Sequence, residues 1–171
     1  RNDGGGKFTD VTAEAGVAGD LFSMAAIAAD YDNDGAVDLF VTGFGAVILY
    51  HNNRNGTVTD VTAKAGVKVS GWSLGSAWLD FDRDGCVDLF VGRYVKFDPK
   101  YRNYYAADNY PGPLDYEPET NVLFRNNCNG TFTDVSEKSG LSKHLGRTMG
   151  ATAADFDLDG YPDIYVANDK T

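Results

Sequence analysis

Three short stretches of the sequence place carboxylates at one repeated spacing. Each has aspartates at positions one, three, five and nine and a glycine at position six. Alternate residues of a tight loop can converge on one point, and a cation would offset the repulsion between them. We predict three calcium sites, in which the backbone carbonyl at position seven adds an oxygen. The ligands would be Asp30, Asp32, Asp34, Ala36 and Asp38; Asp80, Asp82, Asp84, Cys86 and Asp88; and Asp155, Asp157, Asp159, Tyr161 and Asp163.

These stretches are not EF-hands. An EF-hand loop ends with a bidentate glutamate at position twelve and lies between two helices. Position twelve here is Val41, Val91 or Val166, and the residues after position six read as a strand. A solvated acidic turn without an ion is the alternative interpretation, but three copies in the same strand context favour the calcium sites.

The acidity of the chain is concentrated in these stretches. The formal net charge is -10, and 12 of the 25 acidic residues are the aspartates of the three loops. Three divalent ions would bring the net charge to about -4. The sequence has no basic stripe that could contact phosphates, so we expect no nucleic-acid partner. It also has no apolar run long enough to span a membrane.

Two cysteines, Cys86 and Cys128, do not form a CxxC motif, so zinc is not indicated. They could pair with each other, and the sequence leaves this open. The chain begins with Arg1 and shows no apolar signal segment, so we expect a mature or excised piece of a larger protein.

Two markers recur along the chain at a period of about fifty residues. The acidic loops are one marker, and a Thr-Asp-Val segment at residues 7–12, 57–62 and 131–136 is the other. We divide the chain into repeat units of about 1–50, 51–125 and 126–171, within a single segment 1–171. The middle unit carries an insertion at residues 93–120. A period of this size indicates a propeller, a solenoid or an array.

Each unit predicts four antiparallel strands. The first strand, rich in small residues, covers 23–29, 72–79 or 148–154, and the acidic loop joins it to the second at 37–42, 87–92 or 163–167. The third strand, at 47–51 or 122–125, meets the fourth through an Asn-Gly turn. Four antiparallel strands make one blade of a β-propeller, with the small-residue strand nearest the axis. The fold class is therefore all-β, as a partial propeller of about three units, and a β-sandwich is the alternative.

The acidic loop followed by Asp-Leu-Phe-Val resembles the FG-GAP/VCBS repeats of integrin α-chain propellers and of many secreted bacterial proteins. The segment Asn129-Gly130-Thr131-Phe132 and the aromatic insertion resemble, more narrowly, the cartilage acidic protein and ASPIC/UnbV group. The resemblance implies calcium in the three loops, an extracellular or secreted location (periplasm or cell surface in a bacterium) and a non-catalytic interaction role. Such propellers close with about seven blades, so we expect contacts with further blades of the same chain or of another copy.

The insertion at 93–120 contains many tyrosines and prolines, among them Tyr104 and Tyr105. It joins strands two and three, so it emerges on the face opposite the acidic loops. Long loops on rigid scaffolds often carry function, so this face could bind a protein partner or a glycan. Alternatively, the loop folds over its own blade and hides its aromatic rings.

The sequence therefore predicts a calcium-stabilised propeller module for extracellular adhesion or partner binding. The alternative is a carbohydrate-binding or polysaccharide-degrading propeller module.

We expect no enzyme, because the aspartates are assigned to metal and only Glu117 and Glu119 stand out as free carboxylates. Asn55 and Asn129 lie in glycosylation sequons but also form the expected hairpin turns. His51 and His144 have no catalytic partner at a recognisable spacing.

Overall fold

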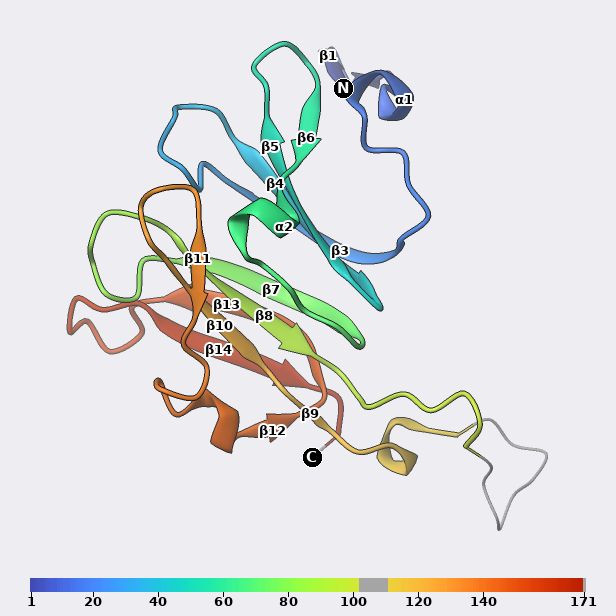
Figure 1. Cartoon of the computed structure of the whole chain (residues 1–171), viewed down its shortest axis with the longest axis vertical. Helices are drawn as coiled ribbons and strands as arrows, with labels where there is room; N and C mark the ends of the chain where they lie inside the picture. The colour runs from blue at the N-terminus through green and yellow to red at the C-terminus, as the bar shows by residue number, and fades with distance from the viewer. Residues whose placement is uncertain (102–110, 171) are drawn as a thin grey trace.

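Strand-forming segments separated by glycine-rich turns build most of the chain, and the computed structural model describes residues 1–101 and 111–170. Two four-stranded antiparallel meanders form the centre (Figure 1). The first consists of β3 (Phe22–Ala29), β4 (Asp38–Phe44), β5 (Val47–Asn52) and β6 (Val58–Asp60). The second consists of β7 (Ser73–Leu79), β8 (Asp88–Arg93), β10 (Val122–Asn126) and β11 (Phe132–Asp134). The predicted four-strand blades are confirmed.

Partial blades flank these two sheets. β13 (Thr148–Ala154) and β14 (Asp163–Asn168) repeat the first two strands of a blade on one side. β1 (Asn2–Gly4) and β2 (Lys7–Phe8) form a separate hairpin that corresponds to strands three and four. β9 (Glu119–Thr120) and β12 (Leu145–Gly146) pair with each other where the insertion returns to the second blade.

The small-residue strands lie side by side, as the propeller arrangement predicts. β7 lies between β3 and β13, so the first strands of three successive blades are neighbours. The backbones approach closely there: a Cβ atom added at Gly75 would lie 2.4 Å from the Cα atom of Gly150. Only glycine allows this approach.

The two complete blades each bury one face of the second strand against the blade that follows. Phe40 and Phe90 occupy the same place in β4 and β8, and both are fully buried, with 0% exposure. Their counterpart in β14, Tyr165, is 63% exposed. β8 is buried on both faces, since Leu89 and Val91 belong to the apolar core shared with the first blade. The core therefore runs between blades, as in stacked repeats.

Single helical turns follow the fourth strands. α1 (Thr12–Ala15) and α2 (Thr62–Ala65) each end at a glycine with left-handed φ, Gly16 and Gly66. The 3₁₀ turns η1 (Pro113–Asp115) and η2 (Leu141–Lys143) lie in the insertion and after β11. A four-residue helix is too short to show periodicity, so the sequence predicted no helices there. Within the described residues, no helix has the length and hydropathy that a membrane crossing requires.

Candidate calcium-binding loops

The three acidic loops are the connections β3–β4, β7–β8 and β13–β14, and all three project from the same side of the molecule (Figure 1). The described parts of the insertion lie on the opposite side, as predicted. Position six has left-handed φ in every loop: 85° at Gly35, 88° at Gly85 and 91° at Gly160. The left-handed conformation turns the chain back toward the first aspartate.

The carboxylates at positions one and five hold each loop closed through backbone amides. In the first loop, Asp30 accepts hydrogen bonds from the N–H groups of Asp34 (3.0 Å) and Gly35 (2.8 Å). The Oδ1 atom of Asp34 accepts the N–H group of Ala36 at 2.8 Å. The second and third loops repeat this pattern with their own residues. The hydrogen bond from Ala36, followed by the one from Arg54, lowers the pKa of Asp34.

The carboxylate at position nine lies at the base of the loop, where the second strand begins. Asp88 is completely buried and accepts the N–H groups of Phe81 (3.0 Å) and Asn126 (2.7 Å). Asp38 accepts the corresponding N–H groups of Tyr31 (3.2 Å) and Asn52 (2.8 Å). Burial raises the pKa of Asp88 to about 6 and also raises the pKa of Asp38. These two groups therefore pay a desolvation cost when ionised in the folded protein.

The position-three aspartates differ from the others. In the described structure, the buried Oδ1 atoms of Asp32 and Asp82 have no hydrogen-bond partner. Such buried oxygens are costly without a positive partner. Both lie in groups of carboxylates whose oxygens come within 4.8 Å of one another, and the third loop repeats the grouping: Asp30, Asp32 and Asp34; Asp80, Asp82 and Asp88; Asp155, Asp157 and Asp163. The donor set of each loop is all oxygen, which fits a hard divalent cation such as calcium.

Basic side chains from the third strand face two of the loops, and they were not among the predicted site residues. Arg125 at the end of β10 contacts Asp82 (2.7 Å) and Asp84 (3.3 Å). His51 holds the same place in β5, and its Nδ1 atom lies 3.2 Å from Asp32 and 3.5 Å from Asp38. His51 therefore belongs to the site, although the sequence showed only that it has no catalytic partner at a recognisable spacing. A comparison of Leu-Tyr-His-Asn-Asn with Leu-Phe-Arg-Asn-Asn could have found this position.

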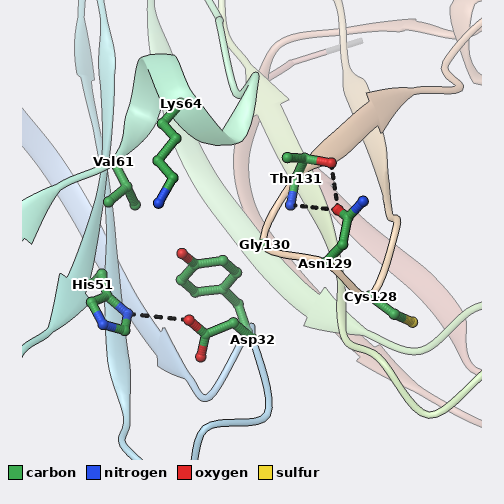
Figure 2. A pocket seen from close by; sticks show the side chains of 9 residues that line it. Asp32, His51, Val61, Lys64, Cys128, Asn129, Gly130 and Thr131 are labelled. Atoms are coloured by element: carbon green, nitrogen blue, oxygen red, sulfur yellow. Dashed lines mark hydrogen bonds and ion pairs between the residues drawn. The ribbon is translucent and has the colours of Figure 1, made fainter.

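A small pocket opens beside the first loop, between the two complete blades. It has a volume of about 250 Å³, and its lining includes His51 and Asp32. Lys64 of α2 and His51 lie on one side of it, and the turn at Cys128–Thr131 lies on the other (Figure 2). The Asn129 side chain accepts hydrogen bonds from the N–H and hydroxyl groups of Thr131 within that turn. The turn predicted at this sequon is confirmed.

Cys86 and Cys128 form a disulfide, which the sequence left open. The bond joins position seven of the second acidic loop to the β10–β11 turn. Arg125 comes from the same hairpin, so the second loop is fastened to β10 and β11 both covalently and by ion pairs.

The insertion packs aromatic rings against the blades. Trp72 contacts Phe44, Tyr94 and Phe97 edge to face, with ring centroids 5.3–5.7 Å apart. Phe97 also contacts Tyr116. Phe44 and Phe97 remain 43% and 40% exposed, so the insertion both covers its own blade and presents rings to solvent. Tyr104 and Tyr105 lie outside the described residues.

The two glutamates that stood out as free carboxylates are paired. Glu119 is buried and forms an ion pair with Arg93, and Glu117 forms one with Lys96 at 2.8 Å. The expectation that they are free is wrong, because the insertion returns alongside β8 and brings them next to its basic residues. Neither residue is an unengaged acid or base.

The repeated loop, the four-stranded blades and the blade-to-blade core define a repeat protein of the propeller class. The FG-GAP-like repeat family matches residues 30–91 and 105–166, which together make up more than half of the chain. The protein belongs to this family. The match does not single out the cartilage acidic protein and ASPIC/UnbV group. No curated protein matches the chain.

Proposed function

We propose that this protein is a calcium-binding, calcium-stabilised propeller module that serves extracellular adhesion or the binding of a protein partner. One observation carries the calcium assignment: in two loops the position-three carboxylate has a buried oxygen without a hydrogen-bond partner among the described residues. The carboxylates around it are already held in place by backbone amides. Each of these two loops is therefore preorganised around a carboxylate oxygen that has no donor, and calcium would complete it beside the existing contacts of Arg125 and His51.

The aspartates of each loop and the carbonyl at position seven would hold the ion. Calcium would supply charge neutralisation to carboxylates that the fold brings within 4.8 Å of one another. Asp38 and Asp88 would gain most, because their burial disfavours the ionised form. Magnesium fits less well, since it prefers a smaller octahedral shell and retains its water.

Two observations support an extracellular location. The described structure contains a disulfide and no free cysteine, and disulfides persist mainly in oxidising compartments. FG-GAP-like repeats are also typical of extracellular and secreted proteins. Calcium concentrations there match the roughly 10⁻⁴–10⁻³ M affinities of many extracellular modules.

The partner surface would be the insertion face. Phe44 and Phe97 expose part of their rings there, over a base formed by Trp72 and Tyr94. Partly exposed aromatic rings on a fixed base suit contacts with proteins or sugars, because little conformational freedom is lost on binding.

The calcium assignment is tested by metal analysis and thermal unfolding. The purified protein should contain calcium, and excess chelator should lower the melting temperature. Each site at a tenfold excess over Kd contributes about 1.4 kcal/mol. Asp82→Asn should remove part of the shift, whereas Asp20→Asn, on an exposed loop, should not. A protein without metal and with an unchanged melting curve in chelator would refute the assignment.

The partner surface is tested by cell attachment to wells coated with the protein. Phe97→Ala should reduce attachment, and because the ring also packs on Trp72, attachment is compared at a temperature where thermal unfolding shows the variant to be folded. Phe8→Ala, which alters a 76% exposed ring on β2, is the control and should have no effect. Binding to an immobilised glycan panel that is lost in Phe97→Ala would instead favour the carbohydrate-binding module.

A further inference from the structure

In the first and second acidic loops, the side chain at position four reaches the next loop along the chain. We propose that these side chains couple neighbouring calcium sites, so that an ion in one loop orders the loop that follows. The inference rests on the proposed calcium function, and it concerns Asn33 and Arg83, which the ligand pattern does not include.

In the first loop, the coupling residue is Asn33. Its side-chain amide donates a hydrogen bond to the carbonyl oxygen of Gly85 at 3.1 Å and lies 3.7 Å from the sulfur of Cys86. Gly85 and Cys86 are positions six and seven of the second loop. Asn33 therefore contacts the peptide that immediately precedes the predicted ligand carbonyl of Cys86.

In the second loop, Arg83 takes the same role with different chemistry. Its guanidinium lies 5.0 Å from the centre of the Tyr161 ring, a cation–π contact. A Cβ atom added at Gly160 would lie 3.3 Å from an Arg83 nitrogen. Gly160 and Tyr161 are positions six and seven of the third loop. Two unrelated side chains thus contact equivalent residues, which indicates that the placement belongs to the repeat.

Position four is suited to transmit order because it lies between two ligand positions. Its backbone is left-handed in all three loops, with φ of 56° at Asn33, 60° at Arg83 and 63° at Leu158. An ion held by positions three and five would fix this strained residue from both sides. The fixed side chain then restrains the glycine of the next loop, the residue whose backbone has the most freedom to lose. Ordering that glycine before the second ion arrives reduces the entropy lost on binding.

The third loop provides a natural control. Leu158 is 87% exposed and contacts no further acidic loop in the described residues. The variant Leu158→Gly therefore measures how glycine at position four affects calcium binding by its own loop. Asn33→Gly makes the same change and also removes the amide. Glycine accepts the left-handed φ in both cases, so neither variant is strained.

The test is calcium titration by isothermal calorimetry on the full chain. Three variants, each of which removes calcium binding from one loop, assign the binding steps: Asp32→Ala, Asp82→Ala and Asp157→Ala. Asn33→Gly should weaken binding at the second loop by about two- to tenfold, the range of one hydrogen bond. Arg83→Gly should weaken the third loop, and Leu158→Gly should leave the second loop unchanged.

Occupancy of the first loop gives a second readout. Silencing the first loop with Asp32→Ala should weaken the second loop when Asn33 is present, and this difference should disappear in Asn33→Gly. Unchanged affinity of the second loop in Asn33→Gly would overturn the coupling and leave calcium binding intact. Absence of calcium binding in the unaltered protein would overturn both the coupling and the proposed function.

Discussion

Asn126 donates its side-chain amide to the carbonyl oxygen of Tyr31 at 2.7 Å, although the two residues are 95 positions apart. The same amide donates to the carbonyl oxygen of Val87 at 2.9 Å. Asn126 is fully buried, and its backbone N–H group binds Asp88. One side chain thus links the acidic loop of the first blade to the acidic loop of the second.

Replacing Asn126 should therefore cost more than replacing its counterpart in the first blade. Asn52 makes the local hydrogen bonds, to Val37 and Asp38, but within the described residues its side chain makes no hydrogen bond to another blade. Asn126→Ala leaves two carbonyl oxygens unpaired and should lower the free energy of unfolding by about 2–4 kcal/mol. Asn52→Ala should cost about 1 kcal/mol. Urea unfolding measures both, and equal losses would contradict the bridging role.

Because the first strands of neighbouring blades approach closely, alanine at two facing glycines should have unequal effects on stability. Gly75→Ala places a Cβ atom 2.4 Å from the Cα atom of Gly150, where the backbone cannot yield cheaply. Gly150→Ala meets nothing within 4 Å. Gly75→Ala should destabilise the fold by about 2–4 kcal/mol, in the range of overpacked core sites, and Gly150→Ala by less than about 1 kcal/mol. Thermal unfolding of both variants provides the comparison, and similar melting temperatures would argue against the close strand packing.

The blade and the loops were predictable because both are local patterns that recur. Asp30, Asp80 and Asp155 begin the same spacing, and the strands on either side follow from alternation and from the Asn-Gly turns. The bond from Asn126 to Tyr31 was not predictable, since it depends on how two blades stack. The packing of the insertion could not be predicted either. Its aromatic residues show no periodicity, and only the tertiary structure places Phe97 on Trp72.

The disulfide should contribute a separate increment of stability. It joins residues 42 positions apart, and bonds of this kind contribute about 2–4 kcal/mol. A double variant, Cys86→Ser with Cys128→Ser, should lose this amount in urea unfolding. A reducing agent should lower the stability of the parent protein equally and leave the double variant unchanged. A reductant effect of the same size in the double variant would show that the loss comes from elsewhere.

Calcium-free protein should become less stable as the pH rises from about 4 to 7. Burial raises the pKa of Asp88 to about 6, above its ordinary value of 3.8. Between these values the folded state binds more protons than the unfolded state, so the free energy of unfolding falls as pH rises. The loss should be on the order of 2–3 kcal/mol, since one pKa unit corresponds to about 1.4 kcal/mol.

The pH effect is measured by urea unfolding in chelator at pH 4.5 and pH 7.5. Asp88→Asn has no charge to bury, so its stability should change less between the two pH values than that of the parent protein. Asp34 provides the opposite case, because hydrogen bonds to Ala36 and Arg54 lower its pKa. Asp34→Asn should therefore retain the full loss of stability between the two pH values.

An equal pH response in the parent protein and Asp88→Asn would show that the buried carboxylate at position nine is not the source of the effect. With calcium present, the parent protein should lose less stability at pH 7.5, because the ion favours the ionised carboxylate.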